Sequence, residues 1–235
     1  RIVTAPLDPV GKHRYSDLGY YAIQRIVERK TGKSLDQFVD DILYRRAGWS
    51  SFSFNPLQKN DVREIAPTEN DTLFRKGRIH GTVHDPGAAM LGGVCGHAGL
   101  FANAYDLARL MHMLRMGGSY GRIDWFEPET VVEWTKRVDE DPEFRKASGF
   151  DRPANEPDSG PTCNEASASS FGHSGFTGTL AWADPDEDIL FVFLSNRTFP
   201  DASNRTLIEW DVRTKIQHEA YQSLGVRSRF NEIRP

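Results

Sequence analysis

A run of six apolar residues at positions 189–194 constrains the fold of this chain more than any other feature. It follows the turn sequence Asp184-Pro185-Asp186 and the stretch 179–183, so the two stretches predict a β-hairpin. Because successive side chains of a strand point to opposite faces, a strand that is apolar throughout needs cover on both. A lone hairpin is only marginally stable, and no strong strand follows this one, so we expect its sheet partners to precede Arg1.

Apolar residues at helical spacing predict two consecutive helices, the first over residues 17–31 and the second ending at Gly48. Ser16 or Asp17 can cap the first helix, and Gly32 can end it. We expect the two helices to form a hairpin. The apolar stripe of the first comprises Leu18, Tyr21, Ala22 and Ile26, and that of the second comprises Leu35, Phe38, Val39, Ile42 and Leu43.

Three further helices are predicted downstream. Asn103 and Asp106 open one of them, Pro128 starts a shorter one, and Ser203 caps a helix near the C-terminus. The last helix repeats apolar residues every four positions, along the face that we expect to lie on the sheet. These residues are Ile208, Val212, Ile216 and Ala220.

Two long segments, residues 49–102 and 139–170, are predicted to be irregular. A loop as long as the first is uncommon in a compact domain unless it is functional or disordered. Seven glycines lie between Gly77 and Gly99, and the second half of the segment is too apolar for a linker. The second segment is rich in Asp, Pro, Ser and Gly, which is typical of an excursion over the surface.

Composition excludes several classes of protein. The 29 Lys and Arg against 33 Asp and Glu, with no basic block, argue against a nucleic-acid partner. No stretch approaches the roughly 20 apolar residues of a membrane span, and the N-terminus shows no export signal. Cys95 and Cys163 have neither the spacing of a zinc site nor the density of a disulfide framework.

Three short stretches carry a family resemblance. They are Tyr15-Ser16-Asp17 at the head of a predicted helix, the glycine-rich region that follows Val83-His84-Asp85 and ends at Phe101, and His173-Ser174-Gly175 at the predicted start of a strand. In this order and spacing they resemble the serine β-lactamase, penicillin-binding-protein and class C-like esterase superfamily. The resemblance covers nearly the whole chain and is nearest to the hydrolase domains that are fused behind glycoside hydrolase family 3 modules.

The resemblance implies an α+β fold of the β-lactamase/transpeptidase type, with an antiparallel sheet flanked by helices and a mostly helical lobe. The whole chain, 1–235, would be one partial domain, with the helical lobe and loops over about 1–170 and the sheet strands and last helix over about 171–235. It also implies acyl-enzyme hydrolysis of an ester, an amide or a cell-wall peptide, and a periplasmic or cell-envelope location. Esterase, carboxypeptidase and β-lactamase activities all stay open.

The nucleophile of this chemistry is missing from the sequence. The family activates its serine with a lysine in a Ser-x-x-Lys motif, and no lysine of this chain has a serine three residues before it. In relatives the motif lies upstream of the Tyr-x-Asn element. We therefore expect an absent N-terminal segment of the same domain to be the partner that completes the site, and we expect no turnover from this chain alone.

The resemblance also assigns roles to the residues that are present. Tyr15 would relay a proton between the nucleophile and the leaving group. Asp17 and Ser174 would contact the substrate, and Gly175 would let the substrate backbone approach the strand. His173 would supply a hydrogen bond and part-time positive charge, and the N–H of Phe176 would be an oxyanion donor.

Two of these residues bear on the substrate. Asp17 stands where the family carries asparagine, and a carboxylate accepts hydrogen bonds but repels anions. His173 stands where β-lactamases often carry lysine, and histidine is less charged at neutral pH. We expect a small-molecule or peptide substrate, with neutral esters or peptides preferred to anionic penicillins.

Two different classes of function stay open. His80, His84, Asp85 and His97 include the ligand types of a zinc site, which would make the chain part of a metal-dependent hydrolase. Pro86 and the glycines deny these residues the helical geometry of a His-Glu-x-x-His motif, so we favour hydrogen bonds that brace the loop, with no metal and no cofactor. The second class is a non-catalytic binding module with the same fold.

Overall fold

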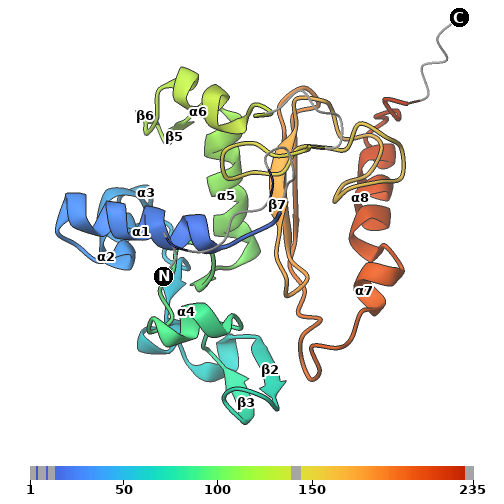
Figure 1. Ribbon diagram of the computed structural model, residues 1–235. Coiled ribbons are helices and arrows are strands. Elements are labelled where there is room, and N and C mark those ends of the chain that lie inside the picture. The colour runs from blue at the N-terminus through green and yellow to red at the C-terminus, as the bar shows by residue number, and fades with distance from the viewer. Residues whose placement is uncertain (1–3, 5–8, 10–13, 139–143, 231–235) are drawn as a thin grey trace, which may run out of the picture. The chain divides into compact units, whose positions relative to one another are not determined.

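The computed structural model describes Thr4, Pro9 and residues 14–138 and 144–230. These residues belong to two units, which divide between Ala102 and Asn103 (Figure 1). Positions 139–143 of the predicted surface excursion lie outside the described residues. The prediction of one partial domain stays a prediction.

The first unit begins with the two predicted helical stretches. Helix α1 (Leu18–Thr31) ends at Gly32, whose φ of 70° is the left-handed conformation that glycine adopts most readily. The second stretch comprises α2 (Leu35–Val39), a π-helical turn η2 (Asp40–Tyr44) and α3 (Arg45–Ala47), and it ends at Gly48 with a φ of 73°. Both helices and both glycine stops are confirmed.

The segment predicted to be irregular contains regular structure, so that prediction was wrong in part. Two-residue strands β1 (Ser53–Phe54) and β4 (Leu100–Phe101) pair antiparallel across its length, and β2 (Pro67–Asp71) pairs with β3 (Gly77–His80). Two 3₁₀ turns (Pro56–Gln58 and Val62–Glu64) and the short helix α4 (Pro86–Met90) complete it. These elements are too short, or too polar in the case of β2 and β3, to give an apolar period in the sequence.

The core of the first unit is a pair of small clusters. Trp49 and Phe52 are almost fully buried, and the Phe52 ring stacks on Tyr44 with centroids 4.7 Å apart. Burial raises the pKa of Tyr44 to about 12, so this phenol stays protonated. The second cluster comprises Val83, Ala88 and Cys95, with Tyr21, Ala89 and Ala98 packed against it.

The second unit is built on an antiparallel sheet of three strands in the order β7-β8-β9. Strands β8 (Leu180–Asp184) and β9 (Ile189–Phe193) form the predicted hairpin. Strand β7 (Phe171–Ser174) adds a third strand, which begins before the predicted start at His173. The His-Ser-Gly element therefore lies at the end of a strand and the following turn, not at the start of a strand as predicted.

Helices cover both faces of this sheet (Figure 1). Ala183 of β8 lies in a cluster with Phe171 of β7 and Met111 of α5 (Ala104–Arg115), a helix capped by Asn103 as predicted. From the opposite face of β8, Asp184 reaches Tyr221 of α8 (Val212–Ser223). The period-two alternation along β8 thus divides the unit into helix, sheet and helix layers.

The remaining elements are short, and the predicted C-terminal helix needs correction. Strands β5 (Ser119–Tyr120) and β6 (Ile123–Asp124) form a small hairpin, and Pro128 begins α6 (Pro128–Thr135) as predicted.

The predicted C-terminal helix is in fact two helices, α7 (Thr206–Glu209) and α8, because Asp211 between them has a φ of 53°. Ser203 is not its cap. Of the predicted sheet-facing residues, Ile208 and Ile216 are exposed, and Gln217 and Tyr221 are buried instead.

None of the helices in the described part of the chain combines the length and the apolar composition that crossing a membrane requires.

Candidate active site

The head of α1 carries the first predicted site residues. The Oγ of Ser16 accepts a hydrogen bond from the N–H of Leu18 at 3.2 Å, so Ser16 performs the capping. Asp17 occupies the N-cap position without a capping bond from its side chain. Tyr15, just ahead of the helix, is 65% exposed. A cap supplied by Ser16 leaves the Asp17 carboxylate available for other contacts.

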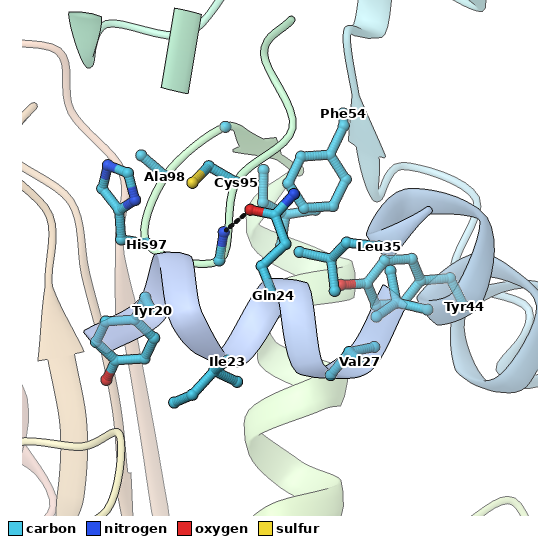
Figure 2. A pocket seen from close by; sticks show the side chains of 14 residues that line it. Tyr20, Ile23, Gln24, Val27, Leu35, Tyr44, Phe54, Cys95, His97 and Ala98 are labelled. Carbon is cyan, nitrogen blue, oxygen red and sulfur yellow. Dashed lines mark hydrogen bonds between the residues drawn. The ribbon is translucent and has the colours of Figure 1, made fainter. Parts of the chain in front are cut away.

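The glycine-rich loop is held on α1 by Gln24, the buried residue of that helix. Its Nε2 donates to the carbonyl of Val94 at 3.2 Å. Its Oε1 accepts from the N–H of Gly96 at 3.3 Å, the dashed line in Figure 2. A Cβ at Gly96 would lie 2.8 Å from the carbonyl oxygen of Tyr20, so only glycine allows this approach. The loop is therefore fixed against the helix that begins just after Tyr15.

The pair Asp85 and His97 braces the same loop, as predicted. An oxygen of Asp85 accepts the N–H of Ala88 at 2.7 Å, which caps α4, and lies 2.8 Å from His97 Nε2. The ring of Tyr21 packs on His97 with centroids 4.7 Å apart. Burial opposes ionisation of Asp85, but the Ala88 N–H and the His97 ring together lower its pKa below the ordinary value.

The residues weighed above as an alternative zinc site separate into different contacts. His80 Nε2 donates to the carbonyl of Ile65 at 2.6 Å, and His84 Nε2 lies 3.3 Å from a carboxylate oxygen of Glu69. A different group of possible metal ligands contains Asp17 and lacks His80 and His84. In this group Asp17, Asp85 and His97 each offer one donor atom within 4.8 Å of the other two. Zinc accepts carboxylate and imidazole donors, so these three are the described residues that could hold a metal ion.

The second group of predicted site residues lies at the end of β7. Asp151 pairs with Gly172 on the strand's outer edge, donating to the Gly172 carbonyl at 2.6 Å and accepting its N–H at 3.1 Å. Because peptide groups alternate in direction along a strand, the Ser174 backbone faces the same outer edge. Within the His-Ser-Gly element, the Ser174 backbone therefore faces that edge, just beyond the Asp151 bridge, whereas His173 pairs with Ala181 of β8.

The histidine ring has a defined tautomer. His173 Nδ1 lies 2.8 Å from the carbonyl oxygen of Ser174, which can only accept. Nδ1 must therefore carry the proton. In the neutral ring, Nε2 is left as an acceptor, and in the protonated ring it becomes a donor.

The turn after β7 is held by an arginine that the sequence analysis did not single out. Arg197 is 8% exposed, and its Nε donates to the carbonyl of Phe176 at 2.9 Å while its guanidinium lies 4.4 Å from the centre of the Phe176 ring. The same guanidinium donates to the carbonyls of Ala202 and Asn204 at 3.0 Å each. Arg197 thus fixes the plane of the peptide between Phe176 and Thr177.

The packing of the turn itself explains why a glycine occupies position 175. A Cβ at this position would lie 2.3 Å from the hydroxyl oxygen of Thr179, whose carbonyl accepts the Gly175 N–H at 2.8 Å. This packing explains the glycine without a substrate. Its predicted role in substrate approach stays a prediction, as does the Phe176 N–H as an oxyanion donor.

The structure brings the predicted site residues together as two groups. Tyr15 and Asp17 lie in the first unit, and the four residues 173–176 lie in the second. That the groups share one cleft stays a prediction. Gln24 and Arg197 were missed because their partners are backbone groups of segments distant in sequence, for which a single sequence carries no signal.

An antiparallel sheet between helices that carries a His-Ser-Gly strand end, in one chain with a helix headed by Tyr-Ser-Asp, is the arrangement of β-lactamase/transpeptidase-like hydrolases. Residues 1–213 match the family model described as Beta-lactamase. The chain belongs to this family.

Relatives and solved structures agree with that assignment. A Salmonella schwarzengrund protein named "Putative D-alanyl-D-alanine carboxypeptidase" is 38% identical over 218 residues, which are 86% of this chain and 50% of that protein. A protein of the same name from Salmonella newport is 37% identical over the same length and the same shares. The chain thus spans about half the length of the curated relatives it matches.

Two solved structures illustrate the fold. Simvastatin synthase from Aspergillus terreus has a TM-score of 0.64 at 16% identity, with 92% of this chain and 57% of that chain covered. A penicillin-binding protein homologue from Caulobacter crescentus has a TM-score of 0.60 at 24% identity, with 82% and 55% covered. At these identities the likeness shows the fold alone, and it confirms the predicted fold class.

Proposed function

We propose that this chain is the C-terminal part of a serine hydrolase domain that works through an acyl-enzyme. The family match over residues 1–213 carries the proposal. The serine and lysine of Ser-x-x-Lys would come from the rest of the longer protein. By itself the chain would not turn over substrate, because both the nucleophile and its activating lysine are needed for acylation.

Tyr15 and His173 have separate roles in this proposal. The Tyr15 phenol would pass the serine proton to the leaving group, as a general base and then a general acid. His173 would use Nε2 toward the substrate, since its Nδ1–H is already bonded to the Ser174 carbonyl. The Phe176 N–H would donate to the developing oxyanion, and Arg197 would hold the next peptide along the chain through the Phe176 carbonyl.

The substrate we propose is a cell-wall peptide that ends in D-alanine, or a small ester. The name of the Salmonella relatives supports the peptide. Asp17 and His173 support a substrate with little negative charge near them, so an anionic penicillin would be a poor substrate. A periplasmic or envelope location would follow from a cell-wall substrate, and a fusion behind a glycoside hydrolase family 3 module belongs to the same proposal.

The test uses the longer protein with a D-alanyl-D-alanine peptide, a short-chain aryl ester and a cephalosporin. We expect hydrolysis of the first two, and Tyr15→Phe to lower kcat by about 100-fold or more, the usual contribution of a proton relay. Tyr105→Phe is the matched control, because Tyr105 is 66% exposed against 65% for Tyr15. Full activity of Tyr15→Phe would remove Tyr15 from the mechanism. Much faster cleavage of the cephalosporin than of the ester would contradict the charge argument.

A metal-dependent hydrolase is the second candidate, and the Asp17, Asp85 and His97 group favours it over a non-catalytic binding module. Stoichiometric zinc in the purified longer protein, together with activity lost on chelation and restored by zinc, would replace the first proposal. A binding module would show ligand binding with no turnover and no Ser-x-x-Lys in the parent gene.

A further inference from the structure

Three ionisable side chains meet at the head of α1, the helix that follows Tyr15 in the chain. Asp17, Asp85 and His97 each offer one polar atom, and these atoms all lie within 4.8 Å of one another. Asp17 stands at the N-cap of α1, Asp85 at the N-cap of α4, and His97 in the glycine-rich loop. Because Asp17 is a predicted substrate contact, the charge of this cluster acts where we expect the substrate.

Asp85 is held by one of its two carboxylate oxygens. Its Oδ1 accepts the N–H of Ala88 at 2.7 Å and lies 2.8 Å from Nε2 of His97, so neither of these bonds uses Oδ2. Burial raises the pKa of Asp85, but these bonds outweigh it and lower the pKa below its ordinary value. An ionised carboxylate only accepts hydrogen bonds, so His97 Nε2 must carry the proton. At neutral pH the cluster therefore contains a fixed negative charge at Asp85.

The cluster has more acceptors than donors. Ser16 caps α1, so the side chain of Asp17 makes no capping bond. With Nε2 protonated, a neutral His97 keeps Nδ1 as an acceptor, and the described residues supply no donor to it. The His97 side chain is only 5% exposed, so water has little access to this nitrogen. The surplus of acceptors suits a ligand that only donates.

Two neighbouring side chains respond to the negative charge of the cluster. The Tyr21 phenol and the Cys95 thiol both have a raised pKa, first because of burial and then because of nearby negative charge. Asp85 and Asp17 contribute to that charge at each of the two groups. The potential at the head of α1 is therefore negative, so it attracts cations and repels anions.

A primary ammonium group matches the cluster in both charge and hydrogen bonding. It carries three N–H donors and no acceptor. With hydrogen bonds of about 2.9 Å, the acceptors around a tetrahedral nitrogen lie about 4.7 Å apart. The three polar atoms of the cluster lie within 4.8 Å of one another, so they can surround one such nitrogen. A metal ion bound through His97 Nε2 would first have to displace the proton that joins this nitrogen to Asp85.

We propose that Asp85 is a specificity-determining residue that acts with Asp17 to select substrates carrying a primary amine. The inference rests on the proposed hydrolysis, and it narrows the substrate to peptides that end in D-alanyl-D-alanine and carry a free amino group on the preceding residue. A site built around buried acceptors rejects an analogue that brings no donor, because the acceptors then lose water without gaining a partner. The same peptide with its amine acylated is therefore a poor substrate.

The test compares three peptides on the longer protein. They differ only in the side chain of a lysine before D-alanyl-D-alanine, which is a free amine, acetylated or succinylated, and so positive, neutral or negative. We expect kcat/KM to be about 10-fold higher for the amine than for the acetylated peptide, the effect of a charge-assisted hydrogen bond, and lowest for the succinylated peptide. Asp85→Asn keeps an oxygen for the Ala88 N–H but removes the charge, so it should reduce the 10-fold preference to about 2-fold or less.

Asp61→Asn is the matched control. Asp61 is also an N-cap aspartate of the first unit, whose side chain accepts the N–H of Arg63, and its substitution should leave the preference unchanged. The preference is a ratio measured on one preparation, so a lower folded fraction in a variant cancels from it.

Equal kcat/KM for the amine and acetylated peptides in the unmodified protein would overturn the proposal. So would an Asp85→Asn variant that loses activity toward both peptides equally, which would show that Asp85 serves only the fold or the activating lysine of the longer protein. One zinc ion per molecule that is lost in Asp85→Asn would also overturn it, because the cluster would then be a metal site. If none of the three peptides were hydrolysed, the proposed function would fail, and this inference with it.

Discussion

Individual polar residues hold the two candidate site segments in place. Gln24 fixes the glycine-rich loop on α1, Asp85 joins the start of α4 to His97, and Arg197 fixes the turn that contains Phe176. All three bond to backbone groups, which are present at every position of a chain. Side chains that satisfy buried backbone groups contribute most when their removal leaves those groups without a partner.

Gln24→Leu tests this at one residue. The substitution would leave the Val94 carbonyl and the Gly96 N–H without their partner, so we expect the free energy of unfolding to fall by about 2–3 kcal/mol. Gln37→Leu is the matched control, because Gln37 is exposed on α2 and should change stability by less than about 0.5 kcal/mol. Urea unfolding monitored by tryptophan fluorescence measures both. Equal effects of the two substitutions would show that Gln24 does not hold the loop.

The sequence predicts the role of a single residue where its hydrogen-bond partners lie close to it along the chain. Gly32 and Gly48 end their helices, and Ser16 and Asn103 act as caps, because each depends on neighbours within four residues. Gln24 and Arg197 were not predictable, since their partners lie 70 and 21 positions away in sequence. The His173 tautomer was equally beyond the sequence, because it depends on the orientation of one ring.

Among the elements, the sheet of the second unit is joined to α8 by a buried polar contact. Asp184, fully buried at the end of β8, accepts hydrogen bonds from the Ser167 N–H at 2.8 Å, the Ser167 hydroxyl at 2.5 Å and the Tyr221 hydroxyl at 3.1 Å. The pKa of Tyr221 is raised by burial and by the Asp184 charge. Ionising this phenol would place a second negative charge beside the carboxylate, away from water.

Tyr221→Phe therefore changes how stability depends on pH. Because the folded pKa of Tyr221 lies above the unfolded value of about 10, its contribution is complete below pH 10 and is lost as the pH rises from there toward the folded value. We expect the phenylalanine variant to be less stable by about 1 kcal/mol at pH 8, from the lost hydrogen bond. The deficit should shrink as the pH is raised from 10 to 11, as measured by guanidinium unfolding. A deficit that grew over this range would contradict the assigned cause.

The elements that the sequence predicted are those with long apolar periods. The α1 helix, the second helical stretch, α5 and the β8–β9 hairpin all follow from them. The bounds of strand β7 were predicted wrongly because it has four residues, two of which are polar, and its place depends on pairing with β8. The break at Asp211 was missed because a continuous four-residue repeat concealed it.

For the whole molecule, the chain belongs to the beta-lactamase family and spans about half of its curated relatives. In α1 the apolar residues Leu18, Ile23 and Ile26 are exposed, and the apolar strand β9 pairs only with β8 among the described strands. The sequence predicted a missing partner from the absence of Ser-x-x-Lys and from the apolar strand. It could not predict the groove of about 500 Å³ that Tyr20, Ile23 and Val27 of α1 line, because this groove depends on how α1, α2 and the glycine-rich loop pack together.

The most direct test of the central claim is covalent labelling of the longer protein with a fluorophosphonate, followed by mass spectrometry to locate the modified residue. The labelled residue should be a serine upstream of residue 1, three positions before a lysine, and the 235-residue chain alone should take up no label. A labelled serine within residues 1–235, or a longer protein that carries an upstream Ser-x-x-Lys and remains unlabelled while it cleaves the peptide, would contradict the assignment.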